Sequence, residues 1–265
     1  MTKTEHLNPI GIFDSGLGGL SILKEIHKQL PKEKIIYLAD SQNAPYGEKS
    51  QAKILEYSIQ NTEFLISKGC KLIVVACNTA TTNAINVLRK KFDRPFIGIE
   101  PAIKPASIQS KTGQIGILAT RGTLASHLFH KNAKEISKKT KIIEVVGCGI
   151  VEAIENDTVH TLEFEKLLAN QLQPFIDNDI DYLVLGCSHY PFIISKLKAI
   201  LDEKVNIIDS GYAVAKQTQR ILKKNKLNKN NLDSQNHIEI FTNGTSKNAL
   251  NTILRQLHLK HYIIH

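Results

Sequence analysis

Short apolar runs alternate with longer helical stretches along the first hundred residues. The apolar runs are IGIF from Ile10, IIYLA from Ile35, LIVVA from Leu72 and FIGI from Phe96. Each has the length and composition of a buried strand. A long helical stretch runs from about Ser50, a suitable N-cap, to Lys68, and Gly69 is placed to end it. Strands that alternate with helices in this way predict a parallel sheet joined by crossover helices.

The same pattern restarts after the segment EPAIKPA. Further strands are expected near residues 114–119, 142–146, 182–185 and 205–208. The segment IGIFDSGLGG from Ile10 is echoed by IGILATRGTL from Ile115, and Cys77 is echoed by Cys187 at nearly the same separation. These similar offsets indicate two related α/β units, with Pro101 and Pro105 at a crossing between them. Near the C-terminus, HIEIFTNGTSKNALNTILRQL predicts one more strand and helix, which could return to the first unit.

Composition and charge change this picture little. The 265 residues, 42% hydrophobic and 22% charged, are those of a globular protein large enough for two domains. The start, MTKTEHLNPIGIF, lacks the apolar core of a secretion signal, and no run is long enough to span a membrane. We therefore expect a cytoplasmic protein with no membrane partner.

The net charge of +9 raises the question of a nucleic-acid partner. The lysines are spread along predicted helices, and the densest cluster, KKNKLNKNN from Lys223, lies in a polar connector. That cluster lacks the interleaved aromatic residues of a single-strand binding surface. A solvated basic face is favoured over a nucleic-acid surface.

Small polar residues gather where four of the predicted strands end. These groups are Asp14-Ser15-Gly16, Asn78-Thr79, Thr120 to Thr123, and Ser188-His189. In open parallel sheets, ligands bind beyond the carboxyl ends of the strands, where helix N-termini present free N–H groups. The four loops suit a polar, anionic substrate of modest size, although the same residue types are also the usual helix caps.

Dinucleotide, phosphate-loop and metal sites are disfavoured by residue spacing. GLGGLS resembles a dinucleotide fingerprint, with Asp40 near the place of a ribose-binding acid, but Ser21 stands where the last glycine is required. No GxxxxGK[ST] segment exists, which excludes a P-loop. Cys187 and His189 could offer two metal ligands, but no second pair has structural-zinc spacing, so no metal is expected.

The cysteines pose a different question. Cys70, Cys77, Cys148 and Cys187 form no disulfide framework, so each is either a core residue or a reactive thiol. Cys77 and Cys187 follow equivalent strands, where a helix N-terminus or polar neighbours would favour the thiolate. If the two halves face each other with pseudo-twofold symmetry, these thiols lie on opposite sides of a shared cleft. One base and one acid on opposite faces is what inversion of a carbon centre requires.

The segments IGIFDSGLGGLS, YLADSQNAPYGEKS, VVACNTATTNAI, IGILATRGT and LGCSHYPF, in this order, resemble the glutamate racemase family over almost the whole chain. The resemblance implies a cofactor-independent isomerase that interconverts L- and D-glutamate by two-base proton transfer at Cα and supplies D-glutamate for peptidoglycan synthesis. It implies two α/β domains with mainly parallel sheets and an active site in the cleft between them. The first would hold residues 1–100 plus 210–265, and the second residues 101–209.

The resemblance also assigns roles to residues. Cys77 and Cys187 match the catalytic thiols, assisted by Asp14 and by His189 respectively. A family glutamate assists on the second side, and because GCGIVEAIEND departs from the commoner Cys-Pro pattern, Glu155 is the better match and Glu152 the runner-up. The substrate-binding residues expected are Asp14, Ser15, Pro45, Tyr46, Gly47, Asn78, Thr79, Thr120, Thr123, Ser188 and His189.

Some alternatives stay open at this point. Ser188 stands where the family usually has threonine; serine keeps the hydroxyl, but aspartate-type racemases remain an alternative. A two-lobed binding module would have no need of paired thiols, and a nucleic-acid-associated regulator would show steeply salt-dependent DNA affinity. The sequence is compatible with a homodimer but does not determine the oligomeric state or any effector.

Overall fold

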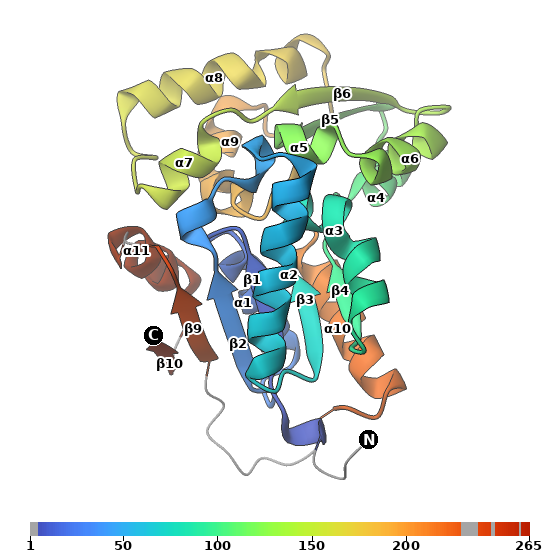
Figure 1. The fold of residues 1–265 in the computed structure, drawn as a ribbon. Helices are drawn as coiled ribbons and strands as arrows, with labels where there is room; N and C mark the ends of the chain where they lie inside the picture. The colour runs from blue at the N-terminus through green and yellow to red at the C-terminus, as the bar shows by residue number, and fades with distance from the viewer. Residues whose placement is uncertain (1–4, 229–237, 245–246, 260) are drawn as a thin grey trace.

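The computed structural model of the chain describes residues 5–228, 238–244, 247–259 and 261–265, and its strands form two all-parallel sheets (Figure 1). The first sheet contains β1 (Ile10–Asp14), β2 (Ile35–Ala39), β3 (Leu72–Val75), β4 (Phe96–Gly98), β9 (Ile238–Thr242) and β10 (Tyr262–Ile264). The second contains β5 (Gln114–Ala119), β6 (Lys141–Val146), β7 (Tyr182–Gly186) and β8 (Asn206–Ile208). The predicted α/β class is confirmed.

The two sheets repeat one order of strands. The order β2-β1-β3-β4 within the first sheet has the same connectivity as β6-β5-β7-β8 in the second. The first sheet is then extended beyond β2, because β9 pairs with β2 from Ile35↔Ile238 to Ala39↔Thr242. The C-terminal segment therefore returns to the first sheet, and it adds β10, a short edge strand that the sequence pattern did not predict.

Helices cover both faces of each sheet (Figure 1). Those of the first unit are α1 (Leu20–Gln29), α2 (Gln51–Ser67), α3 (Asn78–Lys91), α10 (Gly211–Lys224) and α11 (Lys247–Leu257). Those of the second are α4 (Ile103–Gln109), α5 (Arg121–Leu124), α6 (His127–Ile136), α7 (Ile150–Glu155), α8 (Leu162–Asp177) and α9 (Ile194–Ile200). Helix α1 packs against α10 and α2 against α3, so the strands between them are buried on both faces.

Local signals in the sequence set the bounds of the long helix α2. The Ser50 hydroxyl accepts a hydrogen bond from the backbone N–H of Lys53 at 3.3 Å, as expected of an N-cap. Gly69 has φ of +79° just past the other end, a backbone conformation that favours glycine. The Lys-rich segment differs from its predicted connector, because α10 extends through Lys224; residues 229–231 of that segment lie outside the described residues.

The chain crosses between the sheets at two places that lie side by side. One crossing follows β4 and the other follows β8. The Ser210 hydroxyl of the second donates a hydrogen bond to the backbone oxygen of Glu100 in the first, at 2.5 Å. We propose domain boundaries at these crossings, near residues 100 and 210. Among the described residues, no helix is both long and apolar enough to cross a membrane.

Candidate active site

The polar strand ends of the two sheets meet around one small, narrow cavity. Its lining comprises Ser15, Pro45, Tyr46, Gly47, Cys77, Asn78, Thr79, Thr120, Val151, Cys187, Ser188 and His189. Nearly all of these residues were expected in the site, and Val151 was not. The cavity holds about 10 Å³, roughly the space of one water molecule. A substrate as large as an amino acid enters only if the walls move.

Cys77 lies between β3 and α3 and caps the helix. Its sulfur accepts a hydrogen bond from the backbone N–H of Ala80 at 3.4 Å, and its S–H group faces the Ser15 hydroxyl at 3.6 Å. Burial nevertheless raises the pKa of the Cys77 thiol well above its ordinary value, and the charge of Asp14 adds to this. The Ala80 N–H and the Ser15 hydroxyl do lower the pKa, as expected of a helix N-terminus and polar neighbours, but desolvation outweighs them.

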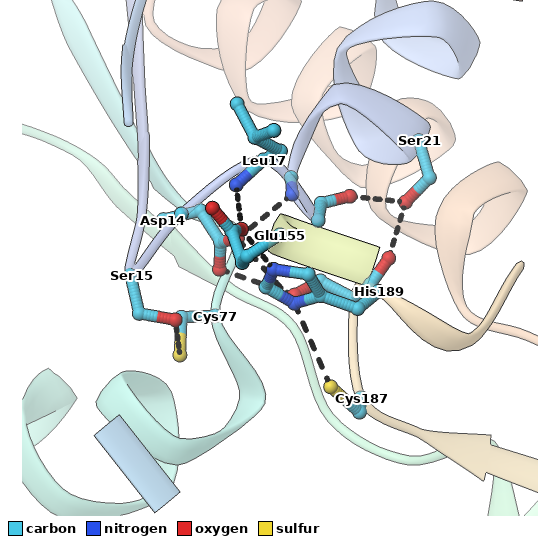
Figure 2. Close-up of polar contacts among 12 residues, drawn as sticks. Asp14, Ser15, Leu17, Ser21, Cys77, Glu155, Cys187 and His189 are labelled. Atoms are coloured by element: carbon cyan, nitrogen blue, oxygen red, sulfur yellow. Dashed lines mark hydrogen bonds and ion pairs between the residues drawn. The ribbon is translucent and has the colours of Figure 1, made fainter. Parts of the chain in front are cut away.

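Cys187 follows β7 and lies next to His189, which leads into the short 3-10 helix η4 (Tyr190–Ile193) (Figure 2). The Cys187 sulfur is 3.8 Å from His189 Nδ1. On the other side of the ring, His189 Nε2 is 2.6 Å from Oε1 of Glu155. The imidazole thus joins a thiol to a carboxylate, and it is Glu155 rather than Glu152 that contacts it.

Charges around the imidazole set its protonation. Burial alone would lower the pKa of His189, but the hydrogen bonds to Cys187 and Glu155 and the charge of Asp14 raise it well above 6.5. Burial opposes ionisation of Glu155 too, yet the bonds from His189, Leu17 N–H and Ser41 lower its pKa below 4.5. At neutral pH the pair is therefore an imidazolium and a carboxylate.

Asp14 ends β1 and is fully buried between the two halves of the site. Its carboxylate accepts hydrogen bonds from the backbone N–H of Gly19 at 2.9 Å and from the Ser188 hydroxyl at 3.1 Å. His189 Nδ1 lies 3.9 Å from the same carboxylate. Burial raises the pKa of Asp14, with His189 and the Gly19 N–H opposing this rise. Asp14 therefore connects the first half of the site to the second, and the hydrogen bond from Ser188 is part of that connection.

The glycines after Asp14 leave room for the second half of the site. A Cβ atom at Gly16 would overlap the Glu155 carboxylate, and one at Gly18 would overlap the His189 ring. A Cβ at Gly19 would lie 2.7 Å from the Asp14 Cβ. The GLGG segment thus accommodates close side chains, a role that accounts for a pattern resembling a dinucleotide fingerprint.

Tyr46 lines the cavity from the short 3-10 helix η3 (Tyr46–Glu48). Its hydroxyl donates to the Asp40 carboxylate and accepts from the Asn61 side chain at 3.0 Å. Burial, followed by the Asp40 charge, raises the pKa of Tyr46. Asp40 therefore anchors a cavity wall.

Polar groups on the remaining wall fall into two sets. The hydroxyl groups of Thr79, Thr120 and Thr123 are 2.8 to 3.2 Å apart and connect α3 of the first unit to the loop after β5 of the second. Asn78 is different. Its side-chain amide is buried at 2% exposure, and neither polar atom of that amide has a hydrogen-bond partner within the described part of the chain. A buried amide without a partner is suited to binding a polar ligand.

Sequence reasoning missed two groups that hold Glu155. The backbone N–H of Leu17 donates to Oε1 at 2.6 Å, and the Ser41 hydroxyl donates to Oε2 at 2.9 Å. The only available signal was that Ser41 follows a strand end, directly after Asp40. Across the residues described, no group of three or more His, Cys, Asp or Glu side chains is arranged to hold a metal ion.

Two parallel α/β sheets whose strand ends surround thiols, carboxylates and an imidazole define a class of α/β enzymes suited to acid–base chemistry. Residues 10–218 match the family described as Asp/Glu/Hydantoin racemase. The chain belongs to this family and is an isomerase of the racemase type.

Individual relatives agree with this placement. The chain is similar to a glutamate racemase of Ralstonia pickettii, with 45% identity over 81% of this chain and 76% of the relative. It resembles the structure of the glutamate racemase isoform RacE1 from Bacillus anthracis, with a TM-score of 0.85, 32% identity, and 97% and 96% of the two chains covered. It also resembles Escherichia coli glutamate racemase in complex with L-glutamate and the activator UDP-MurNAc-ala, with a TM-score of 0.84, 32% identity, and coverage of 97% and 98%.

Proposed function

We propose that the chain is a glutamate racemase that inverts Cα of glutamate by proton transfer between two cysteines. The observation that carries the proposal is the lining of one narrow cavity by Cys77 and Cys187, each from the end of an equivalent strand. The choice of glutamate is supported by the relatives, which are named as glutamate racemases, one of them in complex with L-glutamate.

The first chemical requirement is a thiolate. In the proposed mechanism Cys77 takes the Cα proton of D-glutamate, and Cys187 delivers its own S–H proton to the opposite face; for L-glutamate the two roles reverse. Because burial raises the pKa of the Cys77 thiol, we expect the bound substrate to help to form the thiolate. The α-ammonium group of glutamate can do so, because a nearby positive charge lowers the pKa of a thiol.

The second requirement is a site that stabilises negative charge developing on the substrate. The Cα proton is a very weak acid, so the α-carboxylate needs hydrogen-bond donors and a site closed to water. The buried, unpartnered amide of Asn78 and the hydroxyl of Thr79 are suited to this role. The Ser188 hydroxyl would turn from Asp14 to the substrate when the cavity fills.

Assisting groups differ between the two faces. On the Cys187 face, the His189 imidazolium stabilises the thiolate that remains when Cys187 gives up its proton, and Glu155 keeps the ring charged. On the Cys77 face, Asp14 lies close enough to affect the thiol electrostatically and would accept hydrogen bonds from the substrate ammonium group. Both assignments follow the family resemblance.

We further propose that the reaction uses no cofactor and that its product, D-glutamate, is used for peptidoglycan synthesis. Both points rest on the family resemblance. Cofactor independence is directly testable, because a chelator together with a carbonyl-trapping reagent should leave glutamate racemisation intact.

The decisive test measures racemisation of glutamate and aspartate in deuterated water by circular dichroism and mass spectrometry. The parent should racemise glutamate in preference to aspartate and place solvent deuterium on the inverted product. Cys77→Ser and Cys187→Ser should each reduce turnover in both directions by roughly 10³-fold or more. A serine hydroxyl is a far weaker acid than a thiol, so its deprotonated form, which would have to act as the base, is hardly present at neutral pH. Cys148→Ser, at an exposed thiol outside the cavity, is the matched control. Substantial racemisation by either folded cavity variant would disprove the two-cysteine mechanism.

A further inference from the structure

Ser41 begins the short 3-10 helix η2 (Ser41–Asn43) and lies outside the cavity that holds the two thiols. Its hydroxyl donates to Oε2 of Glu155, while Oε1 of the same carboxylate receives His189 Nε2 and the Leu17 N–H. Ser41 is thus the side-chain donor on the oxygen that faces away from the imidazole. Its hydrogen bond restrains rotation of the carboxylate about its last bond.

The surroundings of Glu155 explain why such a restraint matters. A groove of about 620 Å³ is lined by Ser41 and Glu155 among others, and it shares no lining residue with the cavity that holds the thiols. The Glu155 side chain is 12% exposed, whereas the His189 side chain is 1% exposed. A carboxylate at the edge of a wet groove can turn toward water, and the imidazole would then lose its charged partner.

Ser41 is itself held in place by the returning C-terminal segment. A Cβ atom at Gly244 would lie 2.5 Å from the Cβ of Ser41, so that glycine permits close packing on the serine. The next residue of η2 is fixed as well, because the backbone N–H of Gln42 donates to the Asn243 side chain at 2.9 Å. The position of the serine hydroxyl is therefore set by two segments far apart in sequence.

We infer that Ser41 is a positioning residue for the Cys187 half of the reaction and acts by orienting Glu155 against His189. This inference rests on the proposed two-cysteine racemisation and adds a residue to it. Ser41 touches neither thiol nor the cavity, so its effect on proton transfer passes through the carboxylate and the imidazole.

One readout of the test does not depend on activity. The pKa of the His189 imidazole is measured by ¹⁵N NMR in the parent and in Ser41→Ala. The groups that face this ring are Glu155, Asp14 and Cys187, and all three are retained in the variant. The His189 pKa should fall in Ser41→Ala and stay near the parent value in Ser41→Thr, which keeps the hydroxyl. Gln42→Ala, an exposed neighbour in the same turn, should leave it unchanged.

A second readout separates the two faces of the reaction. Ser41→Ala should lower kcat/KM for glutamate about tenfold in both directions, as for the loss of a hydrogen bond to a charged group. The primary isotope effect should rise with Cα-deuterated L-glutamate, from which Cys187 takes the proton, and fall with Cα-deuterated D-glutamate. General structural damage would not change the isotope effects of L-glutamate and D-glutamate in opposite senses.

The outcomes distinguish this inference from the proposed function. If the parent racemises glutamate but Ser41→Ala changes neither the His189 pKa nor the two isotope effects, Ser41 has no positioning role. If the parent does not racemise glutamate, the proposed function fails, and the NMR measurement still decides whether Ser41 holds the Glu155–His189 pair. An equal activity loss in Ser41→Thr and Ser41→Ala would also overturn the inference.

Discussion

Asn78 illustrates how a single residue can be unfavourable for folding and favourable for binding. Its amide is buried beside the two thiols, and both polar atoms lack a partner among the described residues, although Asn78 occupies the first turn of α3. A buried polar group without a partner destabilises a folded protein unless a ligand supplies the missing hydrogen bonds. We therefore propose that Asn78 gains its partners when substrate fills the cavity.

Replacing Asn78 should separate stability from binding. Asn78→Ala removes the unpaired amide and should raise the free energy of unfolding of the ligand-free protein by about 1 kcal/mol. The same change should raise KM for glutamate at least tenfold, because the substrate carboxylate loses a buried donor. Thermal unfolding and steady-state kinetics on the same preparation test both effects. A less stable variant with an unchanged KM would show that the amide is structural.

At Gly18 the constraint is steric, because there is no room for a side chain beside the His189 ring. A methyl group there would overlap the His189 ring, so Gly18→Ala should displace the imidazole and reduce kcat by roughly 10²-fold. Gly69→Ala is the matched control, since Gly69 has φ of +79° and a Cβ at that position would have nothing within 4 Å. The control should lose about 1 kcal/mol of stability and keep its activity. Equal activity losses in the two variants would contradict this account.

At the scale of elements, α7 and η4 come together through the Glu155–His189 pair. The Glu155 pKa is lowered, so its contribution to stability is present above pH 4.5 and is lost as the pH falls through the lower folded value. The His189 pKa is raised, so its contribution is present below pH 6.5 and is lost as the pH rises through the higher folded value. The pair therefore stabilises the contact between these elements most between about pH 4.5 and 6.5.

This reasoning gives a prediction for Glu155→Gln. The variant should unfold more easily than the parent by about 1 to 3 kcal/mol near pH 6, and the difference should shrink toward both acid and alkaline pH. Urea unfolding at several pH values measures it. Glu152→Gln, on the same helix but without a bond to His189, should differ little from the parent at any pH. A pH-independent difference for Glu155→Gln would show that the pair is not ionised.

The sequence pattern predicted elements better than it predicted contacts between them. Most strands of both sheets were expected close to their observed bounds, because strands such as β1, β3 and β7 are nearly continuous apolar runs. Strand β10 was not predicted, because its three residues, which are half-buried or exposed, show no alternation of apolar and polar side chains. Glu152 and Glu155 are neighbours on one helical face, so only the tertiary contact with His189 distinguishes them. Ser41 was missed for the same reason, because its partner is far away in the sequence.

At the scale of the whole molecule, the site is too small for its proposed substrate. A cavity of about 10 Å³ cannot admit glutamate without movement of its walls, and we propose that the two units separate at the paired crossings near Glu100 and Ser210. The two units meet at Gly47 and Gly122, and each of these glycines packs against a threonine of the other unit. Opening therefore has to break the threonine contacts that connect the units.

Hydrogen exchange can detect this opening. Backbone amides near Gly47 and Gly122 should exchange in the free protein through transient separation of the units and slow by at least several-fold when saturating D-glutamate holds the units together. Amides in β1 and β5, buried within the sheets, should not respond. Mass spectrometry with and without substrate tests this. Equal exchange near both glycines in the two conditions would mean that substrate enters without separation of the units.

The place of β9 beside β2 has a consequence for biosynthesis. The ribosome completes β2 early, but β9, which covers its edge, is made only after the whole second sheet. At about 5–20 residues per second, the edge stays uncovered for on the order of 10 s. An uncovered parallel edge can pair with other nascent chains. The arrangement that fixes Ser41 through the returning segment thus exposes the edge of β2 to incorrect pairing while the chain is being made.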